Sequence, residues 1–129
     1  MEPLQQAVRS AAVLRPFLDE TGSAVGRYCF EEAFVGFRGH FPGRPLLPAV
    51  VQIMAALHVA GAVWKGASEG ALSVDRAKFT LPVVPGDEME VRCEMKRLKG
   101  GTGIEARMSV RGKPASSFLL FPAFGEEAP

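Results

Sequence analysis

One histidine stands where a catalytic base is commonly held. His40 follows Gly39 and precedes Phe41 in the stretch FRGHFPGRPLLPAVVQIMAALHVAG, residues 37–61, and two prolines fix the chain after it. A neutral imidazole has a pKa near neutrality and can accept a proton at pH 7. The loop then enters an apolar segment, Pro48 to about Trp64, that contains no carboxylate. The sequence therefore offers a base beside a helix that carries no acid.

The apolar segment is predicted to be a long buried helix. Proline is well tolerated in a first helical turn, and Gly66 is suited to ending the helix. Because a helix that is apolar all round is normally buried all round, other elements must wrap it. Its apolar residues fall on nearly every side: Val50, Val51, Ile53, Met54, Leu57, Val59 and Val63.

The rest of the chain supplies strands for that wrapping. Strand-like patterns cover about 23–35, 71–82, 89–99, 103–112 and 115–124, with turns at Gly100-Gly101 and Gly112-Lys113. The first 22 residues are predicted to be an arm or a short helix. We therefore expect an α+β fold, in which one antiparallel sheet, ending in a four-stranded meander, curls around one long central helix. Two strands alternate most cleanly and place these residues inward: Met89, Val91, Cys93, Met95, Ile104, Ala106, Met108 and Val110.

Composition excludes several classes of function. The 129 residues fit one domain, 1–129, and 15 basic against 14 acidic residues give a net charge of +1, which offers no argument for nucleic acid binding. The two histidines are 18 residues apart (58 − 40) with no cysteine near either, so no metal site is expected. Cys29 and Cys93 occupy inward-looking strand positions, and buried free thiols are favoured over a disulfide.

Targeting and membrane segments are not indicated. The N-terminus has an early acid and no long apolar region, unlike a signal peptide. The apolar stretch Pro45 to Trp64 is interrupted by Gln52, His58 and prolines, which argues against a membrane span. A cytoplasmic protein is therefore the expectation.

Two stretches carry a family resemblance. The loop GHFPGRPLLP, residues 39–48, resembles the signature loop of the hotdog-fold 3-hydroxyacyl-[acyl-carrier-protein] dehydratases of the bacterial fatty-acid type. The stretch VDRAKF, residues 74–79, with PVVPGD, residues 82–87, is similar to the same family's third-strand segment and following turn. The likeness covers about Val25 to Phe121. It implies a hotdog fold, pairing into homodimers or higher oligomers with active sites at the dimer interface, an acyl carrier protein as substrate carrier, and no cofactor.

The resemblance also implies roles for individual residues. His40 matches the base that removes a proton from C2 of the acyl thioester, and Gly43 matches the loop glycine. Ala49 stands where the family usually has glycine, at the backbone N–H that holds the thioester carbonyl. In the family an acid on the central helix of the partner subunit protonates the leaving hydroxyl at C3, and its position falls on Met54, fourteen residues after His40 (54 − 40). A thioether donates no proton.

Other side chains are candidates to complete the site. His58 lies at i+4 from Met54 on the same helix face and is a tentative replacement acid, although a packed histidine is the commoner role. Gln52 is placed to orient a water or bond a carbonyl. The candidate substrate-binding residues are Phe41, Gly43, Ala49, Gln52, Met54 and Leu57. The basic residues expected near the tunnel mouth, as docking points for an acidic carrier protein, are Arg38, Arg44, Arg76 and Lys78.

Three functions follow from this site. The first is a dehydratase, or lyase, of fatty-acid biosynthesis that acts on 3-hydroxyacyl thioesters. The second is a catalytically impaired hotdog subunit or acyl-binding module, which needs a second hotdog chain to supply the acid in a heterodimer. The third and least favoured is a thioesterase, because hotdog thioesterases also generally use a carboxylate.

Overall fold

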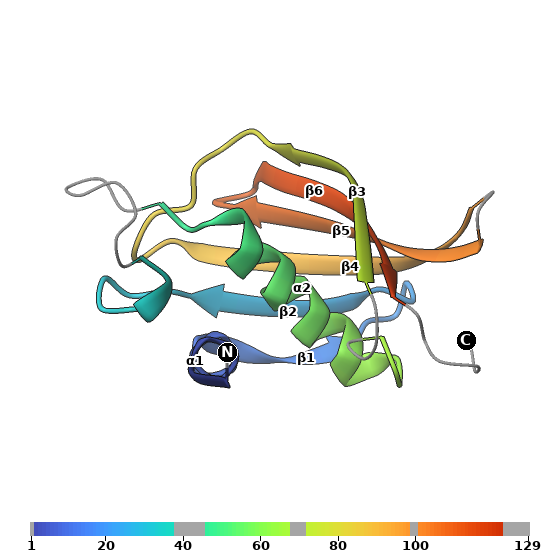
Figure 1. Cartoon of the computed structure of the whole chain (residues 1–129), viewed down its shortest axis with the longest axis horizontal. Coiled ribbons are helices and arrows are strands. Elements are labelled where there is room, and N and C mark those ends of the chain that lie inside the picture. Colours follow the sequence, from blue (N-terminus) through green and yellow to red (C-terminus); the bar gives the residue numbers. More distant parts are fainter. Residues whose placement is uncertain (1, 38–45, 68–71, 99–100, 123–129) are drawn as a thin grey trace.

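The sheet of this protein is a single antiparallel layer with one long helix against it. The computed structural model describes residues 2–37, 46–67, 72–98 and 101–122. Six strands pair in the order β1-β2-β4-β5-β6-β3, and α2 lies along one face of this sheet (Figure 1). The predicted α+β class is thereby confirmed. In chain order the elements are α1 (Glu2–Ser10), β1 (Ala12–Leu18), β2 (Ala24–Cys29), the 3₁₀ turn η1 (Val35–Phe37), α2 (Ala49–Val63), β3 (Leu72–Phe79), β4 (Glu88–Leu98), β5 (Gly101–Val110) and β6 (Lys113–Pro122).

The core lies between α2 and the inner face of the sheet. On β4 and β5 the predicted alternation is confirmed: Met89, Val91 and Cys93 of β4 are fully buried, and so are the four inward residues of β5, while Met95 is partly buried. The outer face carries charged side chains that pair across strands, such as Arg27 with Glu90. This division between faces is what a sheet with one covered side requires.

The helix α2 is covered on only part of its surface. Val51, Ala55 and Val59 are at most 1% exposed, whereas Val50 is 56% exposed and Leu57 is half-buried. The prediction that α2 is buried on all sides is therefore wrong within a single chain. The sheet covers one side of the helix, and α1 covers only a portion of the other side. We call the uncovered side the open stripe of α2; it comprises Val50, Ile53, Met54, Leu57 and Gly61.

The strand after α2 does not join the meander that the sequence predicted. β3 pairs with β6 rather than with β4, so the meander is β4-β5-β6 and β3 forms one edge of the sheet (Figure 1). Every residue of β3 is exposed. A bulge interrupts it where Asp75 pairs with Leu119 and Lys78 with Ser117. Arg76 adopts a φ of 52° there, and its N–H donates to the Asp75 carboxylate at 2.8 Å.

The N-terminal 22 residues contain more structure than the predicted arm or short helix. α1 agrees with the short helix, and Val8 from it enters the core. β1 then pairs with β2 and forms the second edge of the sheet, a strand that the sequence did not predict. The turn between β5 and β6 is Arg111-Gly112, one residue earlier than expected, with φ of 53° and 75° as a type I′ turn requires.

Both cysteines are free thiols, as predicted, but only one is fully buried. Cys93 lies in the core, and burial raises the pKa of its thiol to about 12. Cys29 is half-buried, because it is on the opposite face of β2 from Tyr28. In the described part of the chain, no helix is long and apolar enough to cross a membrane.

Candidate active site

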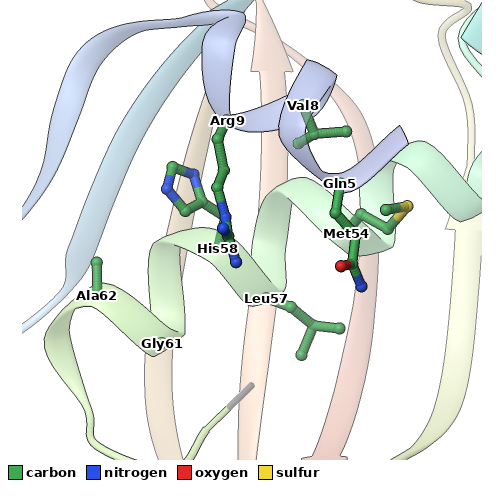
Figure 2. Close-up of a pocket in the computed structure, with 8 residues that line it drawn as sticks. All are labelled: Gln5, Val8, Arg9, Met54, Leu57, His58, Gly61 and Ala62. Atoms are coloured by element: carbon green, nitrogen blue, oxygen red, sulfur yellow. The ribbon is translucent and has the colours of Figure 1, made fainter. Parts of the chain in front are cut away.

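Two cavities lie against α2, at different points along it. The first, which we call the α1–α2 cavity, has a volume of about 380 Å³ and lies between the two helices (Figure 2). From α2 it is lined by Met54, Leu57, His58 and the last turn of the helix. The facing residues of α1 are Gln5, Val8 and Arg9. Met54, Leu57 and His58 therefore share one cavity, as their i, i+3, i+4 spacing requires.

His58 is held from beneath by a tyrosine of the sheet. Its Nδ1 lies 2.5 Å from the hydroxyl of Tyr28, which is 0% exposed. The same hydroxyl lies 3.4 Å from the carbonyl oxygen of Ala55, so Nδ1 is the nearer acceptor. A phenol has one proton, so when Tyr28 donates it to Nδ1, the neutral ring keeps its own proton on Nε2.

The imidazole of His58 is biased toward its neutral form. Burial lowers its pKa, and the nearby positive charge of Arg9 lowers the pKa further. Figure 2 shows the Arg9 side chain beside the imidazole at the cavity. A neutral imidazole is a hydrogen-bond donor through Nε2–H but a poor source of a proton.

The second cavity lies at the first turn of α2. It has a volume of about 380 Å³ and is lined by residues 46–49, Gln52 and residues 79–83. We call it the helix-start cavity. Ala49 begins the helix, no side chain among the described residues caps it, and the first N–H groups of a helix have no acceptor within it. This end of α2 therefore presents a partial positive charge that favours a negative oxygen.

A buried amide fixes the chain beside this cavity. Gln52 is 5% exposed, and its Nε2 donates to the carbonyl oxygen of Leu47 at 3.3 Å. The hydroxyl of Ser116 on β6 donates to Oε1 of Gln52 at 2.5 Å. Leu47 also donates its N–H to the carbonyl oxygen of Val83 at 2.8 Å. The segment that enters α2 is thus held from the helix itself and from the loop before β4.

The remaining sequence candidates divide into two groups. Arg76 and Lys78 lie exposed on the edge strand β3. The others lie outside the described residues: His40, Phe41, Gly43, Arg38 and Arg44. The structure thus brings Ala49 and Gln52 to the helix-start cavity, and Met54, Leu57 and His58 to the α1–α2 cavity.

Sequence reasoning missed three side chains near these cavities. Arg9 and Gln5 reach the α1–α2 cavity because α1 packs on α2, and no sequence spacing links those segments. From the sequence, Tyr28 is predicted only as a strand-forming residue. Its inward position in β2 is the feature from which a buried contact with the helix could have been predicted.

Comparisons with known proteins agree with this architecture. A family model described as ApeI-like, ApeI dehydratase, matches residues 18–117. A 3-hydroxyacyl-[acyl-carrier-protein] dehydratase FabZ of Clostridium botulinum (strain Okra / Type B1) is 37% identical over 119 residues, which cover 84% of this chain and 81% of the relative. The FabZ of Clostridium tetani is 40% identical over 82 residues, 58% of this chain and 56% of the relative.

Solved structures show the same fold. The dehydratase heterocomplex ApeI:P from Xenorhabdus doucetiae matches with a TM-score of 0.69 at 24% identity, over 84% of this chain and 93% of that chain. The E. coli PaaI protein from the phenylacetic acid degradation operon matches with a TM-score of 0.60 at 13% identity, over 92% and 88%. These likenesses establish the hotdog fold. Because the family model spans residues 18–117 and a FabZ relative shares more than a third of its aligned residues, the chain belongs to the ApeI-like family of hotdog dehydratases.

Proposed function

We propose that this chain takes part in dehydrating 3-hydroxyacyl thioesters carried by an acyl carrier protein, with His40 as the base. The observation that carries the proposal is the helix-start cavity in a member of a dehydratase family. In the reaction a proton leaves C2, the C3–O bond breaks, a C2–C3 double bond forms, and the hydroxyl departs as water after gaining a proton.

The start of α2 supplies the electrostatic part of this chemistry. Removing the C2 proton places negative charge on the thioester oxygen, and uncapped N–H groups at a helix start stabilise such a charge. Ala49 stands at this position. The hydrogen bonds of Gln52 to Leu47 and Ser116 hold the entering segment in place, so the donors need little reorganisation during the reaction.

Met54 leaves the second half of the reaction without a proton donor on α2. Losing a general acid typically costs about 10²- to 10⁴-fold in rate. His58 is nearby in the same cavity, but its neutral form offers a hydrogen bond rather than a proton. A chain acting alone is therefore expected to turn over slowly.

A partner chain is the alternative source of the acid, and exposed surfaces support an assembly. β3 is an edge strand with exposed Leu72, Val74 and Phe79, and the open stripe of α2 is apolar. Apolar surface of this extent on an unpaired strand and helix favours burial against another chain. We propose that a second hotdog chain covers it, in a homodimer or in a heterodimer. The likeness to ApeI:P, which is a dehydratase heterocomplex, supports an assembly of this kind.

Basic side chains near the proposed site fit an acidic carrier protein. Arg76 and Lys78 are exposed on β3, and Arg38 and Arg44 precede α2 in sequence. Positive side chains at the rim of a site steer an acidic partner even when the net charge is near zero. A cytoplasmic location belongs to this proposal, and the two free thiols agree with a reducing compartment.

The test is turnover of a 3-hydroxyacyl carrier-protein thioester by the chain alone, beside His40→Ala and Met54→Glu. We expect slow turnover by the wild type, a gain of about 10²- to 10⁴-fold in Met54→Glu, and loss of that gain when His40→Ala is added. Val50→Glu is the matched control, since it adds the same charge one turn earlier on the open stripe.

Three outcomes separate the candidate functions. Fast wild-type turnover that His40→Ala abolishes would mean that the acid has been replaced, and His58→Ala would then identify the replacement. Turnover that appears only after a second hotdog chain is added would support the heterodimer. Release of the free carrier thiol without loss of water would contradict the dehydratase and favour a thioesterase.

A further inference from the structure

Three side chains with hydrogen-bond donors line the α1–α2 cavity, and two of them, Gln5 and Arg9, are also exposed to solvent. The donors are the amide of Gln5, the guanidinium of Arg9 and the imidazole of His58. Of the described residues that line the cavity, none is Asp or Glu. The rest of the described lining is apolar, and Figure 2 shows Arg9 beside His58, with Gln5 farther along α1 next to Met54. A cavity that combines apolar side chains with a few hydrogen-bonding groups is the usual form of a small-molecule site.

Arg9 supplies a fixed positive charge at this place. Among the described residues it enters no ion pair with a carboxylate. Its place in the last turn of α1 is favourable for the helix dipole, which explains a basic residue there. The dipole does not explain why Gln5, one turn earlier, lines the same cavity. A guanidinium matches the two oxygens of a carboxylate with two parallel N–H groups.

His58 is prepared as the second donor. The Tyr28 hydroxyl lies 2.5 Å from Nδ1, and in the tautomer that suits a carboxylate it donates to Nδ1 while the ring keeps Nε2–H for the ligand. The titratable groups that face the ring from neighbouring elements are Arg9 on α1 and, through the Tyr28 hydroxyl, the Cys93 thiol on β4, which is neutral. The ring is therefore a neutral donor beside a fixed cation.

We propose that the α1–α2 cavity binds a carboxylate at the far end of an acyl chain, and that the protein accepts acyl thioesters that end in this group. This inference rests on the proposed function, in which Met54 stands where the family's acid would meet C3 of the acyl chain. His58 follows Met54 by four residues, about 6 Å along the helix. A chain that passes Met54 thus reaches Arg9 and His58 within one helical turn.

The test is binding of three N-acetylcysteamine thioesters, those of octanedioic acid, of its monomethyl ester and of octanoic acid. None has a 3-hydroxyl group, so binding is measured without dehydration. The binding result can therefore be interpreted even if the chain has no dehydratase activity. We expect the carboxylate-ended thioester to bind about tenfold more tightly than the other two, because a charge-assisted pair with Arg9 is added. Added salt is expected to reduce this preference.

Arg9→Gln is expected to remove the preference for the carboxylate. Arg15→Gln is the matched control, because Arg15 is exposed on β1, outside the lining of the cavity, and loses the same charge. Equal binding of the three thioesters, or a preference that survives Arg9→Gln, would overturn the proposal. Free octanedioate that binds as tightly as its thioester would overturn the assignment to an acyl chain.

A magnetic resonance titration gives an independent readout. The chain has two histidines, so in His40→Ala the ring of His58 is the single histidine signal. A bound carboxylate favours the charged ring, so the octanedioic thioester is expected to raise the pKa of His58, and the methyl ester to leave it unchanged. An unchanged pKa with saturating carboxylate-ended thioester would contradict binding at this cavity.

Discussion

The hydroxyl of Tyr28 and Nδ1 of His58 lie 2.5 Å apart, and this contact connects β2 to the turn of α2 that contains His58. Tyr28 is fully buried beneath the helix, and its ring stacks on Phe30 with centroids 6.0 Å apart. The hydroxyl has no access to water, so His58 is its main partner. The pair fixes the direction of the imidazole from inside the fold.

Stability is expected to fall as the pH drops below about 6.5, because of His58. Burial and Arg9 lower the pKa of His58 in the folded protein, whereas the unfolded chain keeps the ordinary value of about 6.5. The unfolded state therefore binds more protons in the interval between the two values, and the free energy of unfolding decreases as the pH falls through it. Urea unfolding at a series of pH values from 7.5 to about 5 measures this slope.

His58→Gln is the variant that checks the assignment. It removes the titrating ring and keeps a polar side chain beside Tyr28, so the slope between pH 7 and pH 5 should flatten. A slope of the same size in His58→Gln would show that another group titrates.

Ser116→Ala is expected to destabilise the protein by about 1–3 kcal/mol, because it leaves the buried Oε1 of Gln52 without its donor. Adding Gln52→Leu to Ser116→Ala removes both polar groups, so the double variant should lose less than the sum of the two single variants. Ser117→Ala is the control, since Ser117 is on the opposite face of β6 and should change stability by less than about 0.5 kcal/mol. Equal losses in Ser116→Ala and Ser117→Ala would contradict the role of the buried amide.

The sequence predicted the elements whose patterns are local. β4 and β5 alternate strictly, and α2 is a continuous apolar segment, so their positions follow from periodicity alone. β1 was missed because Pro16 interrupts it and its pairing with β2 shifts register twice, which leaves little regular alternation. The pairing of β3 with β6 joins segments that are far apart in the sequence, and no local sequence pattern predicts it.

The candidate site divides in the same way. Met54 and His58 share a face because they are one turn apart, and this much follows from numbering. Arg9, Tyr28 and Ser116 come from α1, β2 and β6, and they reach α2 only after the whole chain has packed. Their roles depend on tertiary distances, which no spacing along the chain encodes.

Gly26→Ala is expected to cost about 1–3 kcal/mol, because α2 packs directly on this position of β2. A Cβ at Gly26 would lie 2.8 Å from Cγ2 of Val59, which is fully buried. A valine in a helix has one strongly preferred rotamer, so Val59 has little freedom to move aside. Thermal or urea unfolding measures the loss. Val59→Ala opens the space, so the double variant should lose less than the sum of the single variants; strict additivity would contradict the contact.

Asp19→Asn is expected to weaken the junction between the β1–β2 turn and β4 in a manner that depends on pH. One carboxylate oxygen accepts the N–H of Thr21 at 3.0 Å and of Ser23 at 2.9 Å, and the other pairs with Nη1 of Arg92 at 2.6 Å. The hydrogen bonds from Thr21, followed by that from Arg92, hold the pKa of Asp19 far below its ordinary value. A lowered carboxyl pKa contributes stability above about pH 4, the ordinary value, and this stability is lost as the pH falls further. The difference in unfolding free energy between wild type and Asp19→Asn should therefore be largest near pH 7 and shrink below pH 4.

Glu20→Gln, an exposed neighbour with the same loss of charge, should follow the wild type at both pH values. A deficit of Asp19→Asn that is equal at pH 7 and pH 3 would mean that the charge of Asp19 does not stabilise the junction.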